Sequence, residues 1–127
     1  YSENSMYSLT HTIFYITEMG REWNLSNTEK SDIVSTIRFL IVDRILENDL
    51  DILGELILCV IFLNLDSELS KLLKYAKEIL LINQKDNGGF PAPKEWGYES
   101  KYAEFRNIYH TTIVCLGALI WCQEKNI

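Results

Sequence analysis

The most regular feature of this chain is a set of apolar residues at three- and four-residue steps, the spacing of amphipathic α-helices. Two segments show it with charged residues on the opposite face, one from a cap near 26–28 to about 48 and one from an Asp66-Ser67 cap to about 83. We expect both to be surface helices with one buried stripe. Their apolar positions are Ile33, Ile37, Leu40, Ile41 and Ile45 in the first, and Leu69, Leu72, Leu73, Ala76, Ile79 and Leu80 in the second.

Three other segments predict helices that are apolar almost all round, at about 4–18, 49–64 and 107–124. Helices of this kind are buried rather than amphipathic. The stretch from 84 to 106 between the last two helices is non-helical in pattern and rich in aromatic residues. Because long loops in compact domains are usually functional or disordered, we expect this aromatic one to pack as an ordered segment.

The five predicted helices alternate between apolar and amphipathic along the chain. We therefore predict an all-α fold of five helices in antiparallel helical hairpins, a partial α/α toroid with apolar inner and amphipathic outer helices. The segments 10–16, 54–60 and 109–115 align with one another within one position, as expected for stacked helix-pair repeats. We expect residues 1–127 to form one helical-repeat domain; an up-down helical bundle is the alternative.

Composition restricts the partners and the location. The 127 residues carry a formal net charge of −6, which argues against nucleic acid, because phosphate backbones attract positive surfaces. The longest apolar runs are too short to cross a bilayer, which takes ~20 residues.

Cys59, Cys115 and Cys122 lie in apolar helical runs, which indicates buried thiols in a reducing, cytoplasmic compartment. The chain begins at Tyr1 rather than Met, which suggests a processed or truncated piece of a longer protein.

Candidate chemistry lies in the first turns of the three apolar helices. If these helices run side by side in one direction, His11, Glu55 and His110 meet at one rim, with Asp51 as the alternative acid. Two imidazoles and a carboxylate would bind a divalent metal such as zinc, or perform general acid–base catalysis without a metal. Tyr15, one turn after His11, is a further catalytic candidate.

Four residues near the predicted rim are candidates for contact with a substrate. Thr10 and Thr111 adjoin the two histidines in sequence, and Tyr109 opens the last helix. Trp96 belongs to the aromatic segment, which could roof a pocket or close the end of a small helical core.

Three motifs resemble known families. Leu80-Leu81-Ile82-Asn83-Gln84 followed by Gly88-Gly89-Phe90 resembles the glutamine–aromatic repeat of terpenoid cyclases and related α/α toroids, which implies that Gln84 ties a helix start and an aromatic stacks on it. Tyr109-His110-Thr111 is similar to the histidine segment of protein prenyltransferase β-subunits, which implies a zinc-ligand role for His110 alone. The segment 9–15 resembles uncharacterised bacterial helical-repeat proteins that look longer than this chain, which implies that the chain is a C-terminal portion.

These observations leave three hypotheses for function. The first is a catalytic or substrate-binding lobe acting on a hydrophobic or peptide-like small molecule. The second is a non-catalytic module that binds a hydrophobic ligand or a partner protein. The third is an assembly piece whose exposed apolar flanks are covered by a second copy or by a missing N-terminal half.

Overall fold

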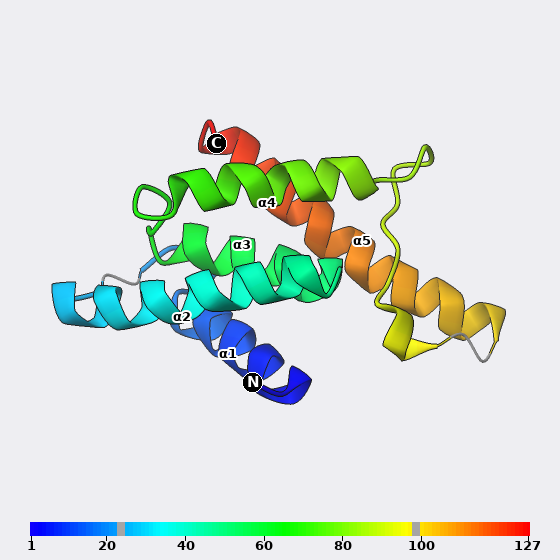
Figure 1. The fold of residues 1–127 in the computed structure, drawn as a ribbon, viewed down its shortest axis with the longest axis horizontal. Coiled ribbons are helices and arrows are strands. Elements are labelled where there is room, and N and C mark those ends of the chain that lie inside the picture. The colour runs from blue at the N-terminus through cyan, green and yellow to red at the C-terminus, as the bar shows by residue number, and fades with distance from the viewer. Residues whose placement is uncertain (23–24, 98–99) are drawn as a thin grey trace.

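The computed structural model describes residues 1–22, 25–97 and 100–127. Within these ranges the chain forms five α-helices, one short 3₁₀ helix and no strand, so the predicted all-α class with five helices is confirmed (Figure 1). The toroidal closure of the helices stays a prediction. The elements are α1 (Glu3–Ile16), α2 (Asn27–Leu46), α3 (Leu50–Phe62), α4 (Ser70–Asn83), η1 (Lys94–Trp96) and α5 (Lys101–Glu124).

Short polar side chains set the starts of four α-helices. The Ser2, Asp49 and Ser100 side chains each accept a hydrogen bond from a backbone N–H in the first turn of α1, α3 and α5, which satisfies a donor that has no partner inside the helix. Ser26 and Glu29 form a reciprocal capping box at the start of α2.

Two predicted helix starts were wrong. α5 begins at Lys101 rather than Asn107, because Ser100 provides a cap about two turns earlier, so the segment after α4 is shorter than predicted. α4 begins at Ser70 rather than after the predicted Asp66-Ser67 cap, and its start has no side-chain cap. The Ser67 hydroxyl instead bonds the Glu68 carboxylate.

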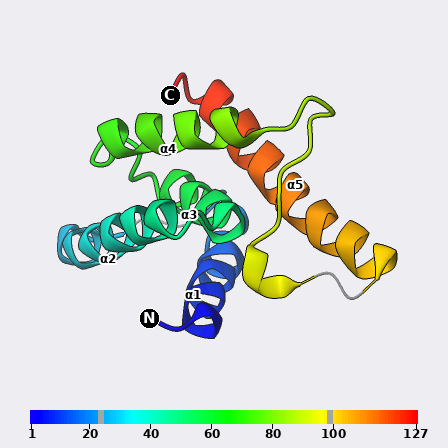
Figure 2. The same cartoon turned by 45° about the vertical axis from the view of Figure 1, so that its right-hand side comes forward.

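α3 is the centre of the fold. All of its residues except Leu58 are buried, and it packs against α1, α2, α4 and α5 (Figures 1 and 2). Its Gly54 lets α5 approach closely, since a Cβ there would lie 2.9 Å from Val114 Cγ1 and 3.4 Å from the Cys115 backbone. The centre of the helical core is therefore the contact between α3 and α5.

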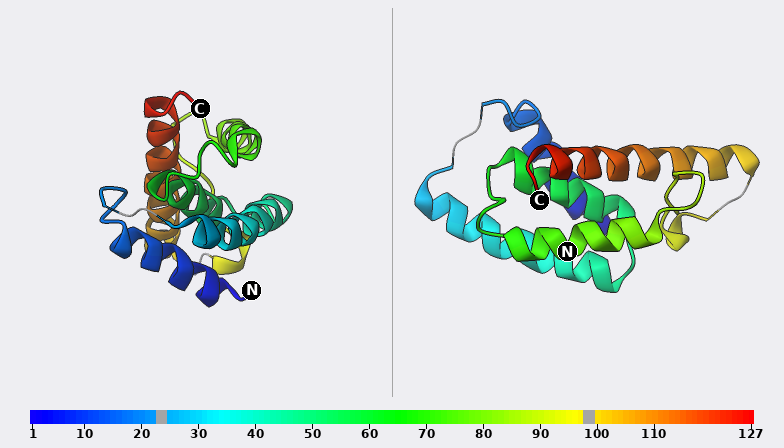
Figure 3. Two further views of the ribbon diagram at one scale, coloured as in Figure 1. Left: turned by 90° about the vertical axis from the view of Figure 1, so that its left-hand side faces the viewer. Right: turned by 90° about the horizontal axis from the view of Figure 1, so that it is seen from above.

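Chain direction alternates from helix to helix. α1, α3 and α5 run in one general direction, and α2 and α4 run in the opposite one (Figures 1 and 3). The beginnings of α1 and α3 therefore lie toward the same end of the molecule, beside the first half of α5. This common direction brings the predicted polar positions within reach of one another.

Among the helices of the described residues, only α3 is buried all round. The same prediction for α1 and α5 was wrong. α1 and α5 each bury one face and expose the other, including the large apolar side chains of Tyr15, Ile113 and Ile120. Apolar residues all round a helix show that it lacks a polar face, but only neighbouring elements can cover every side. None of the helices in the described residues has the length and apolar character of a membrane span.

The loop after α4 is closed by local hydrogen bonds. The Gln84 side chain donates to the Gly88 carbonyl at 3.0 Å, so it ties its own loop and not the start of a helix as the toroid resemblance implied. Phe90 is fully buried, and its N–H donates to the Thr112 hydroxyl of α5 at 3.0 Å. The loop therefore docks on α5 through Phe90.

Candidate functional site

Asp51, in the first turn of α3, is a fully buried carboxylate with three hydrogen-bond donors. The Tyr7 hydroxyl of α1 donates to Oδ2 at 2.5 Å. His110 Nδ1 and the Thr111 hydroxyl, both of α5, each lie 2.8 Å from Oδ1. Three helices thus meet at one carboxylate, and both of its oxygens are occupied.

Glu55 lies one turn further along α3 and is also buried. The Thr10 hydroxyl donates to Oε2, and His11 Nδ1 lies 3.8 Å from the same oxygen. Within the described residues, Oε1 accepts no hydrogen bond. Burial raises the pKa of Glu55, because the charged form loses its hydration.

The two histidines differ in what they hold. His110 Nδ1 donates to Asp51, and this hydrogen bond raises the pKa of His110 because a carboxylate partner favours the protonated ring. His11 Nδ1 lies 2.8 Å from the Tyr7 carbonyl oxygen, which can only accept, so that nitrogen carries a proton. The His11 side chain is 51% exposed and the His110 side chain is 48% exposed. Because Nδ1 of each ring already has a partner inside the protein, Nε2 is the nitrogen that remains for an external partner.

The two rings open into a cleft of about 430 Å³ between α1, η1 and the first half of α5. Trp96 forms one wall; its Nε1 donates to the Glu3 carboxylate at 3.0 Å, and its ring centre lies 6.2 Å from that of His110. The Asn107 side chain donates to the Gly97 carbonyl at 3.2 Å and so joins α5 to the segment after η1. The lining residues are Glu3, Tyr7, His11, Trp96, Arg106, Asn107 and His110.

The structure brings together His11, Glu55 and His110, and it places Trp96 at the same cleft. Asp51, which the sequence offered as the alternative acid, belongs to the cluster together with Glu55.

Four of the predicted roles need correction. Thr10 and Thr111 are fully buried, so they hold the two carboxylates and do not face a substrate. Tyr15 is 80% exposed and lies one turn, about 6 Å, beyond His11, outside the cleft lining. Tyr109 points to another face of α5, about 100° from His110, where it stacks on Phe105 with ring centres 5.9 Å apart.

Sequence reasoning missed Tyr7, whose hydroxyl holds Asp51, and it also missed Glu3 and Arg106 at the cleft. Tyr7 precedes Thr10 and His11 by three and four residues, which puts all three on one face of α1. That spacing was the available signal.

A divalent cation would find its ligands in this cluster at Asp51, Glu55 and His110, whose donor atoms lie within 4.8 Å of one another. To bind a cation, Asp51 would have to exchange hydrogen bonds from two hydroxyls and an imidazole. The donors already in place fit a carboxylate that orients a histidine better than they fit an open metal site.

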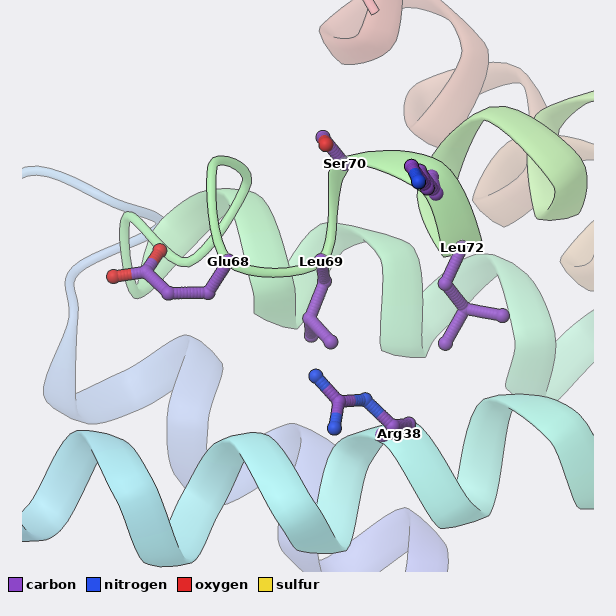
Figure 4. A pocket seen from close by; sticks show the side chains of 6 residues that line it. Arg38, Glu68, Leu69, Ser70 and Leu72 are labelled. Carbon is purple, nitrogen blue, oxygen red and sulfur yellow. The ribbon is translucent and has the colours of Figure 1, made fainter.

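Two other hollows carry different chemistry. Figure 4 shows one of about 330 Å³ between α2 and the start of α4, where the Arg38 guanidinium points toward Leu69 while Glu68 points away. It contains no histidine and no buried carboxylate. The second, of about 460 Å³, lies between α5 and the 84–89 loop and is mostly apolar, with Phe105, Tyr109 and Ile113 in its wall.

The fold and the cluster define an all-helical domain whose central helix presents two buried carboxylates to histidines on two flanking helices. The chain belongs to the family described as domain of unknown function DUF6895, which matches residues 1–120. No curated protein and no solved structure matched the chain.

Proposed function

We propose that this domain is a catalytic lobe of the α/α-toroid kind that carries out general acid–base chemistry on a small hydrophobic or peptide-like molecule. One observation carries the proposal: His110 opens into a cleft while its Nδ1 is held 2.8 Å from a fully buried carboxylate. The alternating helix directions support the toroid part of the proposal.

The Asp51–His110 pair has the arrangement that a general base needs. The carboxylate fixes the ring with its proton on Nδ1, which leaves Nε2 as the acceptor toward the cleft. In an acyl transfer to water, Nε2 takes a proton from the water as its oxygen bonds to the acyl carbon. The imidazolium then gives that proton to the leaving group, and Asp51 stabilises the positive ring between the two steps.

The cleft walls support a partly apolar, peptide-like substrate. Trp96 lies beside His110 with ring centres 6.2 Å apart, and Tyr7 lies beside His11 with ring centres 6.1 Å apart, so the two aromatic rings would hold an apolar group next to the histidines. Arg106 and Glu3 supply one charge of each sign at the same cleft, which suits a molecule with both a carboxylate and an amine.

The test is turnover of p-nitrophenyl butyrate and of leucine p-nitroanilide by the full chain. His110→Gln should lower kcat/KM by about 10²–10⁴-fold, the usual contribution of a positioned general base, and Tyr75→Phe, on the exposed face of α4, should leave it unchanged. Full activity in His110→Gln would refute the proposal. A stoichiometric bound metal whose removal abolishes turnover would refute it in favour of a metal centre.

A second candidate function is a non-catalytic module for a hydrophobic ligand. The mostly apolar groove beside α5 supports it, because it lies apart from the histidine cluster. Farnesol or a long-chain fatty acid should then raise the melting temperature, and Ile113→Glu in the groove wall should abolish that shift.

A further inference from the structure

α5 has two apolar faces on opposite sides. Its inward face packs on α3 through small residues, and its outward face carries large ones that are 37–74% exposed. The buried inward positions are Asn107, Thr111, Cys115, Ala118 and Cys122. The outward positions, called the outer seam here, are Tyr102, Phe105, Tyr109, Ile113, Leu116 and Ile120.

The outer seam is narrow and continuous. At about 100° per residue its six side chains fall within about 80° of the helix circumference, and the seam runs about 27 Å along the axis. An ordinary surface helix turns polar residues outward. A contiguous row of exposed aromatic and branched side chains marks an interaction surface.

We propose that the outer seam packs against the outer seam of a second copy of this chain, with the two α5 helices antiparallel about a twofold axis. The central residues Tyr109, Ile113, Leu116 and Ile120 are spaced by four, three and four, a pattern that reads the same in both directions. A twofold axis midway between Ile113 and Leu116 places Ile113 of one copy against Leu116 of the other. The same axis places Tyr109 of one copy against Ile120 of the other. A twofold contact requires such a self-complementary surface.

Charges beside the seam favour the antiparallel direction. Arg106 and Glu124 are 18 residues apart, five full turns, so they flank the same edge of the seam at opposite ends. The twofold axis brings Arg106 of one copy beside Glu124 of the other, and it does so twice. A parallel pair would place the charges of the two copies on opposite edges of the seam and five turns apart, so Arg106 and Glu124 would not meet. Within the described residues neither side chain makes a salt bridge.

The groove between α5 and the 84–89 loop gives the second copy room to interlock. Phe105, Tyr109, Ile113 and Leu116 of the seam all line this groove of about 460 Å³. The opposing Ile120 and Leu116 side chains would enter it as knobs. Because Arg106 also lines the histidine cleft, the pairing brings Glu124 of the second copy to the rim of that cleft.

Sedimentation of the full chain over a concentration series tests the pairing. The chain should pass from monomer to dimer, and Ile113→Glu should weaken the dimer by about tenfold or more, because the carboxylate would be buried without a partner. Leu46→Glu is the matched control, since Leu46 is 79% exposed on α2 and should leave the dimer intact. A chain that stays monomeric throughout, or a dimer that Ile113→Glu does not weaken, would overturn the proposal.

Two further measurements test the direction. Arg106→Glu and Glu124→Arg should each weaken the dimer, and the double variant should restore it. With oxidised glutathione, a mixture of Ile113→Cys and Leu116→Cys chains should form mixed disulfides, because the native cysteines are buried. Disulfides that join only chains of the same variant would show a parallel pair and refute the antiparallel one.

Discussion

Replacing Asp51 by asparagine or by alanine should separate its charge from its hydrogen bonds. In Asp51→Asn the amide would keep an oxygen for His110 and Thr111, and its NH₂ would face the Tyr7 hydroxyl, which can turn to accept instead of donating. Asp51→Asn should therefore retain the packing and remove only the negative charge. Asp51→Ala removes both oxygens and leaves three donors without their partner.

The structure sets the expected magnitudes. A hydrogen bond to a charged group contributes about 1.5–3 kcal/mol, but losing a buried charge also recovers part of its desolvation. We expect Asp51→Ala to lower the free energy of unfolding by about 3–5 kcal/mol, as when one partner of a buried pair is removed. Asp51→Asn should lower it by only about 1 kcal/mol. The loss expected for Asp51→Ala is a substantial share of the free energy of unfolding of a folded domain, which is typically about 5–15 kcal/mol.

Urea denaturation followed by circular dichroism measures the stability, and NMR titration of the ring protons measures the pKa of His110. The chain has two histidines, so a His11→Gln variant assigns the signals. The pKa of His110 should fall in Asp51→Asn, because the bond that raises it loses its charge. Equal destabilisation by the two variants, or an unmoved His110 pKa in Asp51→Asn, would refute this reasoning.

Two further predictions concern pH and the α3–α5 contact. Because Asp51 raises the pKa of His110, the native state binds the imidazole proton more tightly than the unfolded chain does. The stability that this gives is complete below about pH 6.5 and is lost as the pH rises through the raised pKa. His110→Gln should therefore remove that part of the pH dependence of stability measured by urea denaturation. Gly54→Ala puts a Cβ 2.9 Å from Val114 Cγ1, so this variant should be about 1–3 kcal/mol less stable than Gly117→Ala. The Cβ of Gly117→Ala meets open space, and alanine there gains up to about 1 kcal/mol of helix propensity. Equal melting temperatures for the two variants would contradict the close packing of α3 on α5.

The fold could be predicted because local signals repeat in each helix. Periodic apolar residues located all five α-helices, and polar caps such as Ser26 located one start closely. For α5 the pattern predicted a start near Asn107, but the helix begins at Lys101, where Ser100 caps it. Aromatic residues at 102 and 105 suggested a packed loop, although they lie on an exposed helical face.

The candidate site was predictable only in part. His11, Glu55 and His110 stood out because each is polar in an apolar segment, and they lie together because the three odd-numbered helices share a direction. Tyr7 did not stand out, since a tyrosine in an apolar face is ordinary until its hydroxyl meets a buried carboxylate. Whether Thr10 and Thr111 face solvent or a carboxylate depends on a neighbouring helix.

The sequence by itself determined the helical class, the number of helices and which side chains carry chemistry, because helix periodicity and side-chain type are local properties. Only the tertiary structure decided that Asp51 joins Glu55, that Tyr15 and Tyr109 lie away from the cleft, and that α5 turns its largest apolar side chains outward. Contacts between helices depend on their crossing and rotation, and residues far apart in the sequence fix both together.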